Sequence, residues 1–251
     1  MPMGRDVLEL AAGGLAFGAV YVLLALGFAA LYHSLRMFTK TAGLFLPVLF
    51  IGILAALRWF FELGGGVRLH WRPWLDTVLP YDKAALSTPW GLVSPDLWLT
   101  IAVALAAVAG LGIALRLFPW GTAVRAWLMS PPGAVEHGIE ARRLGFSLLA
   151  AGGVLLALGF GAAGIHGTVE WNWVTLLTSK ALLAAALGGG LRRYGGVVVV
   201  AVAMGLLEAW PPAAPIWSGS WMIYVLAFLF LLGRGLAARA VSWGSAGTGP
   251  P

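Results

Sequence analysis

The uncharged run Leu144-Gly-Phe-Ser-Leu-Leu-Ala-Ala-Gly-Gly-Val-Leu-Leu-Ala-Leu-Gly-Phe-Gly-Ala-Ala-Gly-Ile165 decides the fold of this chain. It is long enough to cross a bilayer as a helix, because roughly 20 apolar residues span the hydrocarbon core. A second uncharged run, Leu97–Leu115, precedes it, and a polar segment from Ala123 to Arg143 lies between the two. The order of apolar run, polar connector and apolar run predicts a pair of membrane-spanning helices.

The composition of the whole chain places it among integral membrane proteins. Hydrophobic residues make up 60% of the 251 residues and charged residues 10%, and the mean hydropathy is +0.89. A soluble domain carries about 25% charged residues. The absence of cysteine excludes disulfides and thiolate metal sites. The net charge of +6 does not indicate nucleic-acid binding, because the basic residues fall at the ends of apolar runs, where they set topology.

We therefore predict an all-α integral membrane protein in a single domain, residues 1–251, with about seven transmembrane helices and a range of six to eight. No secretory signal is expected, because the first apolar stretch is too long for one and lacks a basic start and a cleavage site. The fifth and sixth runs are short, so glycines 188–190, 195 and 196 could make either one re-entrant. The predicted spans are Val7–Tyr32, Thr41–Phe61, Leu97–Leu117, Leu144–Ile165, Trp173–Gly189, Gly196–Trp210 and Ser220–Gly233.

Lys and Arg predict the orientation of these spans, because cytoplasmic loops carry an excess of them. An external N-terminus and an internal C-terminus put residues 62–96 in an external loop and residues 119–143 in a cytoplasmic one. Ten of the sixteen basic residues then lie on the cytoplasmic side: Arg36, Lys40, Arg116, Arg125, Arg142, Arg143, Arg192, Arg193, Arg234 and Arg239.

Small residues recur at the spacing by which membrane helices approach one another closely. Gly14 and Gly18 lie four apart in the first span, and Gly153, Ala157 and Gly161 follow the same spacing in the fourth. We expect both ridges to pack against helices of the same chain rather than to form a dimer face.

Several blocks of sequence share their order and spacing with one transporter family. The first is Gly14–Tyr32, and the second is Gly121–Arg143, with Arg125, Ala126, Gly138 and Ile139 at characteristic places. The others are Lys180–Gly189, Gly205-Leu-Leu-Glu208 and the closing Leu231–Leu236. Together they resemble the branched-chain amino acid (Liv-type) permease family of ABC importers.

The resemblance implies a multi-pass permease subunit in the plasma (inner) membrane of a prokaryote. Its solute would be a branched-chain amino acid or a related small polar molecule, with urea, amides, nucleosides and sugars left open. The implied partners are cytoplasmic ABC ATPase subunits, a second permease subunit or another copy of this chain, an external solute-binding protein and the lipid bilayer. No nucleic acid, cofactor, metal or catalytic residue is expected, and ATP hydrolysis must be external because the chain contains no phosphate-binding loop sequence.

The polar connector is the predicted contact with the ATPase. Pro131 and Pro132 break the chain, and Gly133–Ile139 is expected to form a short helix along the membrane that Gly138 ends. Seated in an ATPase groove, such a helix would transmit rigid-body motion to the spans on either side. The alternative is a solvated loop whose arginines only set topology. The residues assigned to ATPase coupling are Ala134, Glu136, Gly138, Ile139, Arg142 and Arg143.

Lys180 and Glu208 are the candidates for the solute pathway. Lys180 lies seven residues into the fifth span, roughly 10 Å deep at 1.5 Å per residue, and Glu208 is near the external end of the sixth. One charge at the centre of a membrane helix costs about 2.5–3.5 kcal/mol on insertion scales, so such groups are usually paired or functional. The two could form a charge pair in the outer half of the membrane. Alternatively, Lys180 could extend outward beside an interfacial Glu208.

Two other classes compete with a permease. An intramembrane enzyme would place several ionisable groups at matching depth on facing spans, and only Lys180 with Glu208 approaches that arrangement. A structural membrane subunit would not need a connector with the family's spacing.

Overall fold

The computed structural model describes residues 3–38, 86–88, 91–93, 95–166 and 171–209. The predicted second span, Thr41–Phe61, and the predicted seventh, Ser220–Gly233, lie outside these residues, as does most of the 62–96 segment. The other five predicted spans fall within them, apart from Trp210 at the end of the sixth.

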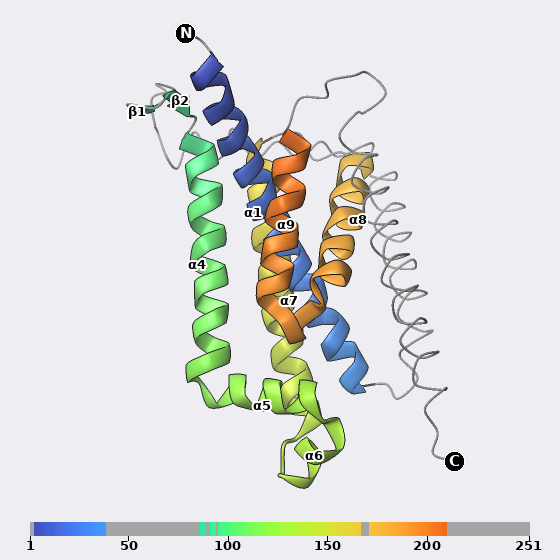
Figure 1. Ribbon diagram of the computed structural model, residues 1–251. Coiled ribbons are helices and arrows are strands. Elements are labelled where there is room, and N and C mark those ends of the chain that lie inside the picture. Colours follow the sequence, from blue (N-terminus) through green and yellow to red (C-terminus); the bar gives the residue numbers. More distant parts are fainter. Residues whose placement is uncertain (1–2, 39–85, 89–90, 94, 167–170, 210–251) are drawn as a thin grey trace, which may run out of the picture.

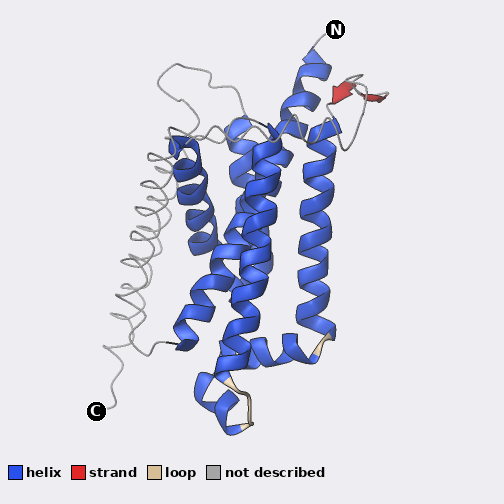
Figure 2. Cartoon of the chain, turned by 180° about the vertical axis from the view of Figure 1, so that it is seen from behind, coloured by secondary structure: helices blue, strands red, loops and turns tan. Residues whose placement is uncertain are grey.

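The described residues are helical apart from one short antiparallel hairpin (Figures 1 and 2). In the hairpin, β1 (Leu86–Thr88) pairs with β2 (Gly91–Val93) so that Leu86 lies opposite Val93. The helices are α1 (Met3–Phe38), α4 (Pro95–Leu117), α5 (Pro119–Met129), α6 (Pro131–Glu136), α7 (Ala141–His166), α8 (Trp171–Gly188), the 3-10 helix η1 (Gly190–Arg193) and α9 (Tyr194–Ala209).

Four helices in the described part of the chain are long and apolar enough to cross a membrane. They include Leu10–Leu35 of α1, Leu97–Leu117 of α4, Ala141–Gly164 of α7 and Gly190–Ala209, which joins η1 to α9. The fifth predicted span is the shorter apolar helix Trp173–Gly188 within α8. The described residues therefore fit an all-α membrane protein, and the total of seven spans stays a prediction.

Helix α1 is the centre of the bundle. The most apolar stretch of α1 is 78% buried, compared with 17% for the corresponding stretch of α4. Helices α7, α8 and α9 all pack around α1 (Figure 1). Leu23, Leu24 and Leu26 are fully buried in the main core cluster. Helix α4 lies at the edge and leaves most of its apolar surface uncovered.

Glycines allow α1 and α9 to cross with their backbones in contact. A Cβ added at Gly205 would lie 2.2 Å from the Gly18 nitrogen, and one at Gly18 would lie 2.9 Å from Val202 Cα. A Cβ added at Gly14 would meet Leu206 Cα at 3.0 Å. The prediction that Gly14 and Gly18 pack within the chain is thus confirmed.

The glycines of α7 that face α1 are not those the sequence pattern selected. Gly152 lies against the Gly27 carbonyl, and a Cβ at Gly159 would lie 2.7 Å from the Leu24 side chain. The predicted ridge was wrong: Gly153 has no neighbour within 4 Å at its Cβ position, and Ala157 is exposed. Adjacent glycines differ by about 100° around a helix, so spacing alone could not decide which of the pair faces inward.

The two ends of the bundle differ in chemistry. The N-terminus and the hairpin lie at one end, and α5 runs across the other, where α6 projects beyond the bundle (Figure 1). The start of α1 and residues 119–143 thus lie at opposite ends of the bundle, and the sides of the membrane on which they lie stay a prediction. The arginines of the connector end are Arg116, Arg125, Arg142, Arg143, Arg192 and Arg193.

We predict that Gly205→Ala destabilises the protein, because the new methyl group would overlap the Gly18 backbone. Overpacking of this kind typically costs ~1–3 kcal/mol. Gly110→Ala, in the open face of α4 where nothing lies within 4 Å, is the matched control and should leave stability unchanged or raise it. Thermal unfolding in detergent would compare the two. Equal midpoints for both variants would contradict the close crossing.

Single cysteines can test the orientation, because the chain has none of its own. We expect Ser87→Cys, in β1, and Met129→Cys, whose native side chain is 79% exposed, to react with a membrane-impermeant maleimide from opposite sides of the membrane. In intact cells only Ser87→Cys should be labelled, and in inside-out vesicles only Met129→Cys. Labelling of both from one side would overturn the predicted topology.

Candidate functional site

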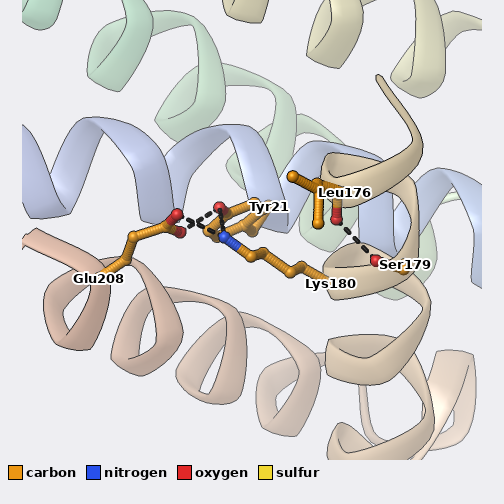
Figure 3. Close-up of polar contacts among 5 residues, drawn as sticks. All are labelled: Tyr21, Leu176, Ser179, Lys180 and Glu208. Carbon is orange, nitrogen blue, oxygen red and sulfur yellow. Dashed lines mark hydrogen bonds and ion pairs between the residues drawn. The ribbon is translucent and has the colours of Figure 1, made fainter. Parts of the chain in front are cut away.

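A buried ion pair joins α8 to α9 in the interior of the bundle. Lys180 Nζ pairs with Glu208 Oε1, and the Tyr21 hydroxyl of α1 donates to Glu208 Oε2 (Figure 3). Lys180 Nζ also lies 3.4 Å from the Tyr21 hydroxyl oxygen and 5.8 Å from the centre of its ring. We call Tyr21, Lys180 and Glu208 the charged triad. Of the two alternatives that the sequence leaves open for Lys180 and Glu208, the structure shows the charge pair.

The apolar face of α8 carries Lys180 inward. Leu177, Ala181 and Ala184 are buried on that helix, and Lys180 is itself only 3% exposed. Its ammonium group therefore ends on Glu208 rather than reaching outward along the membrane, which was the alternative reading of this lysine. The Glu208 side chain is 23% exposed and forms the more open side of the triad.

The triad satisfies its own charges. One oxygen of the Glu208 carboxylate accepts from Lys180 and the other from Tyr21, so the buried ammonium has a counter-ion and the carboxylate has two donors. Removing one member of a buried pair leaves an uncompensated charge, which typically costs ~3–5 kcal/mol.

Sequence reasoning gave Tyr21 no role in this site. A signal was available, because Gly14, Gly18 and Tyr21 are separated by four and three residues and so share one face of α1. That face packs on α9 through the two glycines, which brings the phenol to Glu208. A polar group in line with a glycine ridge can therefore be assigned to the same helix contact.

The connector end contains a helix that the sequence did not predict. Helix α5 buries Gly121, Val124 and Leu128 against the bundle and leaves Arg125 exposed, and it lies across the ends of the spans (Figures 1 and 2). Trp120 Nε1 donates to the Ser147 hydroxyl of α7. The predicted cytoplasmic loop at residues 119–143 is therefore helical over Pro119–Met129, and the two-faced pattern of buried and exposed residues in that stretch is visible in the sequence.

The predicted short helix exists with shifted bounds. It was expected at Gly133–Ile139 and is observed as α6, Pro131–Glu136. Pro131 and Pro132 occupy the first turn, where a missing N–H costs nothing. The Ser130 hydroxyl accepts from the Gly133 N–H at 3.3 Å, and Gly138 ends the turn with φ +77°, as predicted.

The residues assigned to coupling divide between surface and interior. Ala134 is 3% exposed, so its side chain packs inside the connector and does not belong to a docking surface. Ile139 is half-buried beside the core cluster that α5 covers, whereas Glu136 and Gly138 are exposed.

The two arginines at the start of α7 are also exposed. Arg143 Nε lies 2.7 Å from Glu140 Oε2, in a pair too exposed to contribute much stability. The guanidinium of Arg142 lies 6.0 Å from the centre of the Phe146 ring.

Within the described residues, no group of three or more acidic or histidine side chains could hold a metal ion. In comparisons with known proteins, the chain matches no protein-family model, no curated protein and no solved structure.

We predict that Lys180→Met and Glu208→Gln each lower thermal stability in detergent, because each leaves a buried group without its partner. The double variant should recover part of the loss, with an interaction energy of ~0.5–3 kcal/mol between the two sites. Tyr21→Phe should cost less, since Lys180 still neutralises Glu208. Ser179→Ala, beside Lys180 with its hydroxyl bonded locally to the Leu176 carbonyl, is the control. Additive effects of the two single substitutions would mean that the pair contributes no interaction.

Proposed function

We propose that this chain is the membrane-spanning permease subunit of an ABC importer for a small polar solute, with branched-chain amino acids as the first candidates. The observation that carries the proposal is the connector, in which α5 lies across the end of the bundle and α6 projects from it (Figure 1). Separate ATPase subunits, a second permease subunit or second copy, and an external solute-binding protein would complete the importer.

The connector has the mechanical properties that coupling to an ATPase requires. Helix α5 is fixed to the bundle by Val124 and Leu128, which are buried among residues of α1, α4 and α7. Helix α6 has a capped start and an abrupt end at Gly138, so it is a short, defined body. A displacement of α6 would therefore be transmitted through α5 to the ends of the spans, which a flexible loop could not do.

The exposed residues of α6 form the proposed docking surface. Val135 is 55% exposed, and Glu136 and His137 beside it are also exposed. An exposed apolar side chain at the tip of a projecting helix suits insertion into a groove of a partner protein. Arg142 and Arg143 then flank the site where α7 returns to the membrane.

The charged triad supports transport rather than a purely structural role. Ionisable groups inside a membrane are costly and often mark a solute pathway. The triad joins α1, α8 and α9, so a change in the angle between these helices would alter its contacts. We propose that it lies beside the solute route and separates when the route opens.

We predict that Val135→Asp combined with Glu136→Lys uncouples ATP hydrolysis from solute uptake, because the docking surface loses its apolar contact and an ammonium group replaces the Glu136 carboxylate. The variant should still insert and should retain the thermal stability of the native subunit, since both side chains are exposed. The measurement is uptake of labelled leucine and ATP hydrolysis by the complex reconstituted in proteoliposomes.

Thr122→Asp, at an exposed position of α5, is the matched control and should leave uptake per ATP unchanged. Solute-stimulated hydrolysis and uptake at native levels in the Val135 and Glu136 variant would rule out α6 as the coupling element. Failure of the native subunit to bind any ATPase subunit would rule out the importer itself.

A further inference from the structure

The turn between α8 and α9 is bonded to the connector. Gly189 and Gly190 have φ values of +88° and +61°, which reverse the chain directly into η1. Leu191 then packs into the core cluster that contains Val124 and Leu128 of α5. The next residue, Arg192, donates from Nε to the Leu128 carbonyl oxygen at 2.8 Å.

The Leu128 carbonyl is a specific acceptor for this arginine. Helix α5 ends at Met129, so the carbonyl of Leu128 is among the last four, which have no partner within their own helix. A guanidinium group at a helix C-terminus also meets the negative end of the helix dipole. The bond therefore fixes the direction of η1 relative to α5, although the Arg192 residue as a whole is exposed.

Helices α8 and α9 are joined at their turn and again farther along, at the middle of α8 and near the end of α9. At the turn, a Cβ on Gly188 would lie 2.4 Å from Val197 Cα, and one on Gly196 would lie 2.5 Å from the Gly188 carbonyl oxygen. Away from the turn, the Lys180–Glu208 ion pair joins the same two helices. Backbone contact at one end and a buried ion pair toward the other make the hairpin of α8, η1 and α9 a single rigid body.

Among the glycines of this hairpin, Gly205 lies closest to α1. Arg192 lies thirteen residues before Gly205, about 20 Å along the helix, and Glu208 lies three residues after it, about 4.5 Å along the helix. A rotation about the Gly18–Gly205 contact therefore moves the two ends in opposite directions, with the smaller displacement at Glu208. Because Tyr21 is on α1, that rotation changes the bond between the Tyr21 hydroxyl and the Glu208 carboxylate.

We propose that Arg192 is the positioning residue through which displacement of the connector reaches the charged triad. The inference rests on the proposed function and adds to it the route by which nucleotide-driven motion opens the solute site. Motion of α6 passes to α5, from α5 through the Leu128 carbonyl to Arg192, and along the rigid hairpin to Glu208. Arg192 does not contact the triad and acts only through the position of the hairpin.

The first test uses the complete reconstituted complex with labelled leucine as the probe. Arg192→Ala should lower leucine uptake per ATP hydrolysed by about fivefold or more, the lower end of typical coupling between sites, while ATP hydrolysis continues. Arg193→Ala removes an identical charge from the next position and should leave the ratio near the native value. Arg192→Lys should restore part of the ratio, because an ammonium group can still donate to the Leu128 carbonyl. Equal ratios for Arg192→Ala and Arg193→Ala would overturn the inference.

The second test uses the subunit alone, so it stands whether or not an ATPase binds. Arg192→Ala and Glu208→Gln should be non-additive in thermal unfolding, because the hairpin links the two positions. Arg193→Ala and Glu208→Gln should be additive, as expected for distant and independent residues. Additivity of the Arg192 pair would overturn the inference even if the importer works. A non-additive Arg192 pair in a subunit that recruits no ATPase would retain the mechanical link and reject the importer.

Discussion

The backbone contact between α1 and α9 is the constraint on which the rest of the bundle depends. In a bilayer no hydrophobic force drives helices together, so close packing and polar contacts must do so. At Gly18 and Gly205 the two backbones lie so close that a Cβ on Gly205 would be 2.2 Å from the Gly18 nitrogen. That approach places the Tyr21 phenol within reach of Glu208, and the ion pair then brings α8 against the same two helices. The close contact at the glycines thus allows the charged triad to form, and the triad joins α1, α8 and α9.

The connector end is organised around a different principle. There, buried residues of α1, α4, α7 and η1 pack on the apolar face of α5, and hydrogen bonds hold the two ends of that helix. The Trp120 indole bonds to Ser147 near the start of α5, and Arg192 bonds to the Leu128 carbonyl near its end. Helix α5 is held at both ends and along one face, so its position relative to the bundle is fixed. Helix α6 follows it and projects from the bundle. In the proposed coupling, the rigidity of α5 is what would carry a displacement of α6 to the spans.

Sequence patterns predicted the parts of this structure that depend on local chemistry. Apolar runs located the membrane helices of the described residues, and Gly138 located the end of the connector helix, whose start was predicted two residues too late. The depths of Lys180 and Glu208 offered their contact as one of two alternatives. What could not be predicted depends on rotation about a helix axis. Gly152 and Gly153 are adjacent and look alike in the sequence, but of these two only Gly152 faces α1. Ala134 was predicted to couple to the ATPase because nothing in its spacing indicates that its side chain is buried.

The ion pair also constrains how the protein is made. Lys180 is synthesised 28 residues before Glu208, so Lys180 leaves the ribosome before its counter-ion does. An unpaired lysine in the bilayer costs about 2.5–3.5 kcal/mol on insertion scales. The tight glycine turn at residues 188–190 allows α8 and α9 to leave the translocon together as one preformed hairpin, with the charge already neutralised. The same feature that closes the mature bundle thus favours delayed, pairwise release of these two helices into lipid.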